Sequence, residues 1–316
     1  MRDGVGMSVR DHDNYHLLME RCASLPAVVT AVVHPCDAPS LTAAIEAARN
    51  GLITPVLVGP EGKIRAAAAA AGTDLAPFRI VATPHSHAAA AEAVRLARAG
   101  EVAAIMKGSL HTDELMHEVT DGALGLRTGR RISHVYVMDI PRYPKPLMIT
   151  DAAINIMPML EDKRDICQNA IDLAIALGVA RPKVAILAAV ETVEAKFPST
   201  IDAAALCKMA DRGQIRGGVI DGPLAFDNAI DAAAAAGKGI TSRVAGDADI
   251  LVVPDLEAGN MLAKQLTFLA GAEAAGIVLG ARVPIILTSR ADSVRTRLAS
   301  CAVAVILASA AVPLKG

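Results

Sequence analysis

Short runs of apolar, largely β-branched residues alternate with alanine-rich stretches along most of this chain. Each run ends at a Gly, Pro or polar turn, after which a stretch of helical composition often begins. The runs predicted to be strands occupy residues 27–33, 55–58, 103–106, 133–138, 184–187, 218–220, 250–253 and 284–287. Helices are predicted at residues 41–48, 63–71, 113–119, 225–236 and 260–275. Because uninterrupted apolar runs are typical of strands buried on both faces, the repeat predicts an α/β fold with a parallel or mixed sheet.

The segment from residue 124 to residue 151 interrupts this rhythm. It contains Gly125, Gly129 and the pair Arg130-Arg131, and then prolines at 141, 144 and 146. We interpret the Pro-rich piece as a loop or crossover. Single hydrophobic cores stop growing at about 250–300 residues, and this chain has 316. The segment therefore predicts a boundary between two α/β lobes.

The composition excludes several classes of protein. Hydrophobic residues make up 53% of the chain and aromatic residues only 2%. Alanine, with 63 residues, accounts for much of the apolar content. This much apolar surface offsets the entropy cost of ordering, which excludes a disordered chain. A net charge of −2 and so few aromatic rings argue against a nucleic-acid-binding platform. No apolar run approaches the ~18 residues that suggest a membrane span, so we expect no membrane partner.

The cysteines and the N-terminus suggest a compartment. Five cysteines are widely scattered with no Cys-x-x-Cys pair, which is typical of single thiols in a reducing environment. The first 14 residues are polar and lack the apolar core of a signal peptide. We therefore expect a cytoplasmic protein.

Polar residues gather just after the predicted strands, which is where ligands bind in open α/β sheets. Lys107, Gly108 and Ser109 follow one strand and open a helix. Such a turn suits an anion, because free N–H groups, a close glycine approach and the Lys and Ser donors combine there. The alternative is an ordinary helix cap with a solvated lysine.

A second cluster follows the last predicted strand. Thr288, Ser289 and Arg290 present hydroxyls and a guanidinium that could bind a phosphate or a developing oxyanion. Alternatively, Ser289 caps the next helix, with Asp292 completing a variant of the capping box. Both interpretations can hold together.

Carboxylates offer a weaker hypothesis of a metal site. Asp221, Asp227 and Asp255 could hold a divalent cation. However, Asp221-Gly222-Pro223 is also a good turn sequence, and Asp255 can simply cap a helix. The sequence lacks the glycine-rich dinucleotide fingerprint and the P-loop, so the usual signatures of those two functions are missing.

Five stretches match a known family: Met106-Lys107-Gly108 with His111-Thr112, Asp151–Asn155, Gly218–Asn228, Val253–Asn260 and Val283–Ser293. Together they resemble the phosphate acetyltransferase/phosphate butyryltransferase family. The resemblance extends over about residues 102–302, and its wording is most similar to the portion that follows a hydratase domain in fused enoyl-CoA hydratase/phosphate acetyltransferase proteins. We expect no such hydratase domain within these 316 residues.

The resemblance implies a fold and a reaction. The fold would be two α/β domains with a cleft between them, like those of isocitrate and isopropylmalate dehydrogenases, in a homodimer. The first domain would comprise residues 1–130 plus 283–316, and the second residues 131–282. The reaction would be acyl-CoA plus inorganic phosphate giving acyl phosphate plus CoA. CoA would be a substrate, no cofactor would be bound, and no metal would participate.

The resemblance also implies site residues. The Ser-Arg pair that the family uses matches Ser289 and Arg290, with Ser289 as a donor to the carbonyl oxygen or thiolate and Arg290 as a ligand of phosphate and oxyanion. The remaining positions divide into two groups. Phosphate or acyl phosphate would be bound by Lys107, Gly108, Ser109, His111, Thr112 and Thr288, and CoA or the cleft would involve Asp221, Gly222, Pro223, Asp255, Asn260 and Phe268.

Two departures from the acetyl branch leave specificity and the base open. The position of its Asp, taken there as the base for the CoA thiol, is Thr296 here, and Asp292 is the nearest substitute. An Arg of that branch corresponds to Phe268, which could favour acyl chains longer than acetyl. The alternative functions are a metal- and NAD(P)-dependent decarboxylating dehydrogenase on the same fold and a non-catalytic subunit that binds CoA or acyl phosphate.

Overall fold

A computed structural model describes residues 13–288 and 292–310, and its internal contacts divide the chain into two units. We call residues 18–134 and 275–316 the N-terminal unit, and residues 1–17 and 135–274 the central unit. Each unit alternates strands with helices, so the predicted α/β fold is confirmed. The chain crosses between units at 17/18, 134/135 and 274/275, whereas the sequence placed its domain limits at 130/131 and 282/283.

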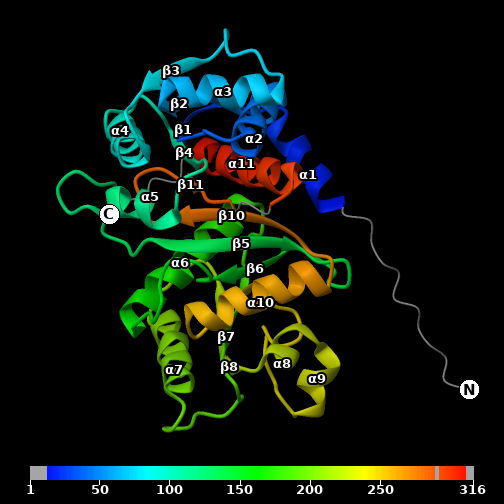
Figure 1. Cartoon of the computed structure of the whole chain (residues 1–316). Helices are drawn as coiled ribbons and strands as arrows, with labels where there is room; N and C mark the ends of the chain where they lie inside the picture. The colour runs from blue at the N-terminus through cyan, green and yellow to red at the C-terminus, as the bar shows by residue number, and fades with distance from the viewer. Residues whose placement is uncertain (1–12, 289–291, 311–316) are drawn as a thin grey trace, which may run out of the picture. The chain divides into compact units, whose positions relative to one another are not determined.

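The N-terminal unit holds a sheet in the order β3-β2-β1-β4-β11-β10. All neighbouring strands are parallel except β10, which runs antiparallel to β11. Figure 1 shows α2, α3 and α11 on one side of this sheet and α4 and α5 on the other. Its elements are β1 (Val28–Val33), α2 (Ala38–Arg49), β2 (Ile53–Gly59), α3 (Glu61–Ala71), β3 (Arg79–Ala82), α4 (Ser86–Arg98), β4 (Ala104–Lys107), α5 (Thr112–Thr120), β10 (Glu273–Leu279), β11 (Ile285–Ile286) and α11 (Val294–Ser309).

The central unit holds the strand order β5-β6-β9-β7-β8, with β5 and β6 antiparallel and the remaining neighbours parallel. One further helix, α1 (Asp13–Cys22), spans the division at residue 17. The central elements are β5 (Ser133–Asp139), β6 (Leu147–Thr150), α6 (Leu160–Ala176), β7 (Lys183–Leu187), α7 (Pro198–Asp211), β8 (Val219–Leu224), α8 (Phe226–Ile230), α9 (Ala232–Gly237), β9 (Ile250–Val252) and α10 (Leu256–Leu269).

Burial explains why the predicted strands were easy to locate. Ala31, Val32 and Val33 of β1 are fully buried, as are Ile105 and Met106 of β4. Helices cover both faces of these strands, so side chains of both orientations leave water, and the alternation of a half-exposed strand is lost. The helices of the described part of the chain lack the length and apolar character that crossing a membrane requires.

Two predicted helices were wrong in extent. The stretch 260–275 is helical only to Leu269, because Gly271 takes a positive φ of 67° and the chain then enters β10. The stretch 225–236 is divided at Asp231, whose extended backbone ends α8 and whose carboxylate accepts a hydrogen bond from Ala234 N, 2.7 Å away, to start α9. Three described strands were missed: β3, β10, and β6 inside the Pro-rich segment.

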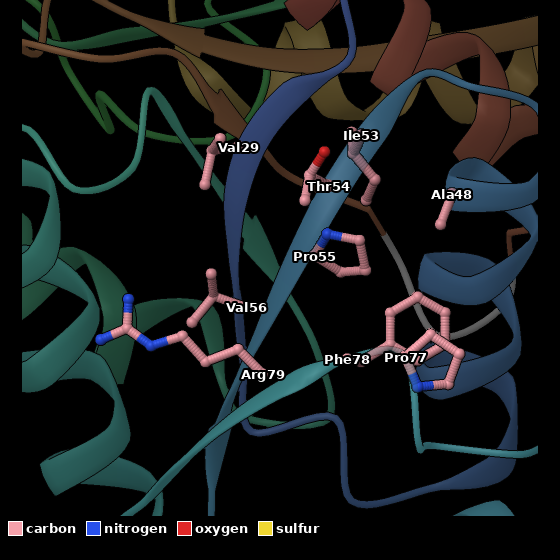
Figure 2. Close-up of a pocket in the computed structure, with 9 residues that line it drawn as sticks. All are labelled: Val29, Ala48, Ile53, Thr54, Pro55, Val56, Pro77, Phe78 and Arg79. Atoms are coloured by element: carbon pink, nitrogen blue, oxygen red, sulfur yellow. The ribbon is translucent and has the colours of Figure 1, made fainter.

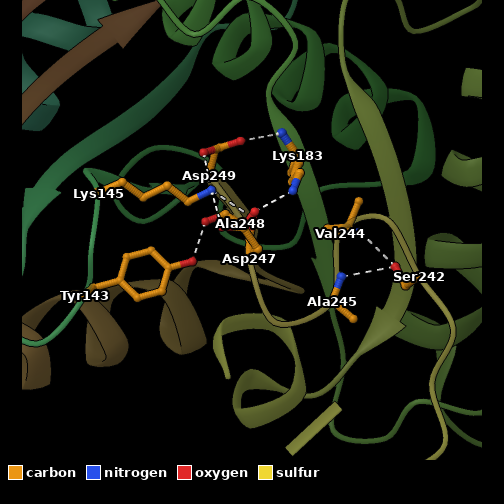
Figure 3. Close-up of polar contacts among 9 residues, drawn as sticks. All are labelled: Tyr143, Lys145, Lys183, Ser242, Val244, Ala245, Asp247, Ala248 and Asp249. Atoms are coloured by element: carbon orange, nitrogen blue, oxygen red, sulfur yellow. Dashed lines mark hydrogen bonds and ion pairs between the residues drawn. The ribbon is translucent and has the colours of Figure 1, made fainter. Parts of the chain in front are cut away.

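An ionic cluster fixes where three chain segments join the central sheet (Figure 3). Lys145 Nζ lies 2.8 Å from Asp247 Oδ1 and 2.6 Å from Asp249 Oδ1. The Lys183 backbone N donates to Asp249 Oδ2 at 2.7 Å, and its ammonium pairs with Asp247. Tyr143 donates its phenolic hydrogen to the Ala248 carbonyl at 2.6 Å. These contacts tie the Pro-rich turn to the starts of β7 and β9.

Candidate functional site

The first candidate cluster lies where β4 ends beside β1. Lys107 is the last residue of β4 and only 6% exposed. Gly108 N donates to Val33 O at 2.9 Å, so the turn continues the pairing of the two strands. A Cβ on Gly108 would lie against Val33 O and 2.8 Å from His34 O, so this close approach requires glycine.

Ser109 connects this turn to the end of β1. Its hydroxyl donates to His34 O at 2.8 Å and accepts from Cys36 N at 3.2 Å, and its backbone N donates to His34 O at 3.0 Å. Ser109 therefore joins the two strand ends directly. Its predicted contact with phosphate stays a prediction.

His34 is held in an unusual conformation at the same strand end. Its φ is +53°, in the left-handed region that non-glycine residues rarely adopt, and its Nδ1 lies 3.2 Å from Ser109 Oγ. Burial, reinforced by the positive charge of Lys63, lowers the pKa of His34 below its ordinary value. Strained backbone that the surroundings hold in place is a feature of functional sites.

A small cavity of about 60 Å³ opens between these strand ends and the segment after β11. Lys107 and Arg297 contribute cationic side chains that are 6% and 5% exposed. A carboxylate and two hydroxyls complete the polar lining, so the cavity offers donors and compensating charge for a small anion. It is lined by Asp37, Pro39, Ser40, Lys107, Gly108, Thr288 and Arg297.

Of the second candidate cluster, Thr288, Ser289 and Arg290, the structure describes only Thr288. Thr288 is 6% exposed and reaches this cavity, whereas Ser289 and Arg290 lie outside the described residues. The alternative in which Ser289 caps the following helix is wrong, because α11 begins at Val294 and its cap is Ser293, whose hydroxyl accepts from Thr296 N at 3.1 Å.

Arg297 fastens the segment that carries this cluster to the rest of the unit. Its Nη1 donates to Pro39 O at 3.2 Å and its Nε to Asp292 O at 3.3 Å. The guanidinium thus links the first turn of α2 to the residues just before α11. Asp292, the predicted base, is half-buried, and it does not line the cavity.

His111 and Thr112 stand at the start of α5, beyond the cavity lining. His111 is exposed, and its backbone N donates to Glu114 Oε1 at 3.3 Å. Thr112 is the first helical residue and is half-buried. Both stay predicted ligands, and the described cavity does not include them.

The predicted CoA-side residues belong to the central unit. Asp221, Gly222 and Pro223 lie inside β8, so their interpretation as a turn was wrong. Gly222 is required there, because a Cβ would lie 2.8 Å from both Cβ and O of Ile186 on β7. Asp221 Oδ1 accepts a hydrogen bond from Gly222 N at 2.8 Å.

The remaining central-unit candidates, Asp255, Asn260 and Phe268, lie along α10 or at its start. Asp255 caps the helix by accepting from Ala258 N at 2.8 Å, as its alternative interpretation predicted. Asn260 donates to Ala152 O at 3.3 Å. Phe268, near the other end of α10, is 76% exposed, so its predicted place in an acyl pocket stays a prediction.

The carboxylates that a metal-dependent activity would need are not assembled. Asp255 caps α10, and Asp227 pairs with Lys238 Nζ at 3.4 Å. Within residues 13–288 and 292–310, no three His, Cys, Asp or Glu side chains come together as a metal site would require.

A larger cavity of about 440 Å³ lies at the opposite ends of the strands (Figure 2). It contains none of the predicted site residues, and its one charged side chain, Arg79, pairs with Glu101 at 3.2 Å. Its size suits a ligand, but its lining offers little chemistry. The lining residues are Val29, Ala48, Ile53, Thr54, Pro55, Val56, Pro77, Phe78 and Arg79.

Sequence reasoning missed three polar residues of the small cavity. Asp37 and Ser40 follow β1, so the strand-end rule that located Lys107 also applies to them. Arg297 had no such signal, because an arginine one turn into a helix looks like an ordinary surface residue.

Buried cationic side chains beside hydroxyls at the carboxyl ends of parallel strands are features of α/β proteins that bind a phosphate or a similar small anion. Residues 78–305 match the family described as "Phosphate acetyl/butaryl transferase". The chain belongs to this phosphate acetyl/butyryl transferase family.

Individual relatives agree with this membership. The chain is 70% identical to a phosphate acetyltransferase of Rhizobium meliloti, over 91% of this chain and 90% of the relative. It is 41% identical to a phosphate butyryltransferase of Clostridium acetobutylicum, over 93% and 97% of the two chains. A branched-chain phosphotransacylase of Enterococcus faecalis V583 has a similar structure, with a TM-score of 0.77, 29% identity, and coverage of 89% and 99%.

Proposed function

We propose that this chain is an acyltransferase that moves an acetyl or short-chain acyl group reversibly between CoA and inorganic phosphate. The observation that carries the proposal is the cavity with buried Lys107 and Arg297 in a member of this family. Thr288 lines the cavity and directly precedes the Ser-Arg pair that the family uses.

The reaction needs an anion held beside a thioester. In the forward direction a phosphate oxygen attacks the acyl carbon, a C–O bond forms and the C–S bond breaks, and the phosphate proton ends on the CoA sulfur. Lys107 and Arg297 neutralise the anion and fix its position. Holding two reactants in place can lower the barrier by roughly 7–11 kcal/mol at best.

Charge also develops on the carbonyl oxygen during the attack. We assign Ser289 as a hydrogen-bond donor to that oxygen or to the thiolate, and Arg290 as a ligand of phosphate and oxyanion. One preorganised donor of this kind is typically worth about 3–4 kcal/mol. Asp292 is the proposed proton acceptor, because Thr296 occupies the position of the acetyl branch's Asp.

The acyl-CoA side is proposed to involve the central unit. There Asp221, Gly222, Pro223, Asp255 and Asn260 would border the CoA site, and Phe268 would contact the acyl chain. As in isocitrate and isopropylmalate dehydrogenases, the reactants would meet in a cleft between two domains, within a cytoplasmic homodimer. CoA acts as substrate, and no bound cofactor or metal is part of the proposal.

A chain-length series tests the function. Acetyl-, propionyl-, butyryl- and longer acyl-CoAs are mixed with phosphate, and free thiol is followed with a chromogenic reagent. We expect phosphate-dependent thiol release that is insensitive to chelators and needs no nicotinamide. Thiol release that requires a metal ion and NAD(P) would favour the dehydrogenase, and CoA binding without turnover on any acyl-CoA would favour a non-catalytic subunit.

The role of Arg290 has its own test. Arg290→Ala should lower kcat/KM for phosphate by about 100-fold or more, on the scale of losing one charge-stabilising group. Arg282→Ala is the matched control, because it removes an exposed guanidinium from the same stretch of chain. Equal activity in the two variants would remove Arg290 from the mechanism.

A further inference from the structure

Asp37 places a negative charge in a cavity otherwise suited to an anion. Its carboxylate lines the same small space as Lys107 and Arg297. A site built only to attract anions would gain nothing from a carboxylate, because like charges in a confined space repel each other. A ligand that donates a hydrogen bond to Asp37 would turn this repulsion into an attraction.

The two oxygens of Asp37 are not equivalent. Oδ1 caps α2 by accepting from Ser40 N at 2.8 Å, and Ser40 Oγ donates to the same oxygen. Oδ2 accepts no hydrogen bond from any residue that the structure describes. One oxygen thus holds the helix, and the other remains an acceptor for a ligand.

The size of the cavity limits what that ligand can be. About 60 Å³ corresponds to roughly four to six water-sized spheres, at ~10–15 Å³ each. A single tetrahedral oxyanion fits this space, whereas a whole nucleotide or coenzyme is too large to be enclosed in it. Two buried cations opposite one carboxylate match an anion that still carries a proton.

We propose that Asp37 is the residue that selects inorganic phosphate over other tetrahedral anions, by accepting the hydrogen of its P–OH group. Near neutral pH phosphate retains a proton, and sulfate, of nearly the same shape, retains none. Phosphate can therefore donate to Oδ2, whereas sulfate would set an oxygen against the carboxylate. The inference rests on the proposed phosphate site and extends it to specificity.

Asp37→Asn tests this proposal with little risk to the fold. Asparagine caps helices about as well as aspartate, so Ser40 N keeps its partner. The changed group can now donate to an anion instead of accepting from it. We expect the KM for phosphate to rise at least about 10-fold, and sulfate to become a competitive inhibitor at least about 10-fold tighter than in the wild type.

Two further variants separate selectivity from capping. Asp37→Ser keeps a capping hydroxyl without the carboxylate and should also gain sulfate sensitivity. Asp231→Asn changes an exposed cap of the same type, on α9, and should leave both constants unchanged. Inhibition by sulfate that stays within twofold of the wild type in both Asp37 variants would overturn the proposal.

Calorimetric titration of phosphate and sulfate into the wild type and Asp37→Asn keeps this test independent of turnover. A preference for phosphate over sulfate that is present in the wild type and lost in Asp37→Asn supports the role of Asp37, even if no acyl transfer is found. Equal preference in the two proteins overturns it, even if the acyltransferase assay succeeds.

Discussion

Gly108 is the point where the candidate phosphate site depends most directly on backbone packing. In Gly108→Ala the new Cβ would lie against Val33 O and within 2.8 Å and 2.9 Å of the O and C atoms of His34. All three atoms are backbone, so no side-chain rotation relieves the contact. The ends of β1 and β4 must therefore separate, and Lys107 and Ser109 move with them.

The size of the effect follows from what has to shift. Overpacking of a well-packed site costs typically about 1–3 kcal/mol, and we expect a loss of that order in the free energy of unfolding. Displacement of a positioning group by ~1 Å can cost about 100-fold in rate. Activity should therefore fall by more than the lost stability explains, with protein that remains folded at the assay temperature.

The assay compares Gly108→Ala with Gly62→Ala, using urea unfolding and phosphate-dependent thiol release. Gly62 lies in α3, and a Cβ added there would have no described atom from another part of the chain within 4 Å. Alanine at this position should therefore stabilise by up to about 1 kcal/mol and leave activity unchanged. A Gly108→Ala enzyme with wild-type stability and rate would refute the reasoning.

Two further predictions concern stability. Ser300 is fully buried, and its hydroxyl accepts from Gly276 N and donates to Thr296 O, both at 2.9 Å. Ser300→Ala should therefore lower the free energy of unfolding in urea by about 1–3 kcal/mol. The control Ser309→Ala, at the end of α11, should lower it by under about 0.5 kcal/mol. Burial lowers the pKa of His134 from 6.5 to about 3. As the pH falls, this histidine therefore takes up a proton in the unfolded chain before it does so in the folded one. The contribution of His134 to the free energy of unfolding should be fully present above pH 6.5 and should fall toward pH 3, by up to about 1.4 kcal/mol per pH unit. In urea unfolding at a series of pH values, His134→Gln should flatten that slope. An unchanged slope would exclude His134 as the cause.

Most of the described strands could be predicted because strands buried on both faces leave a clear apolar run. The end of the predicted helix at 260–275 could not, because Ala270 to Ala275 suits a helix in composition. Only the positive φ of Gly271 reveals that the chain turns there into β10. Local propensity is a weak prior, and the neighbouring β11 offers hydrogen bonds that a helix would forgo.

The part of the candidate site that lies at the ends of strands could be predicted from the sequence. Lys107 and Thr288 follow strands and do share a cavity. Arg297 required knowledge of the packing, since its burial and its hydrogen bond to Pro39 O arise only in the folded chain. The role of each such residue depends on which side chains line the same cavity, and the spacing of residues along the sequence does not show this.

The division of the N-terminal unit into two chain segments has a consequence for biosynthesis. Its strands β1 to β4 leave the ribosome first, but β11 and α11, which complete the unit, come last. Between them lie residues 135–274, which take roughly 7–28 s to translate at about 5–20 residues per second. During that interval the edge of β4 that will pair with β11 waits without its partner, so nascent chains stalled before residue 275 should be the species that engages chaperones.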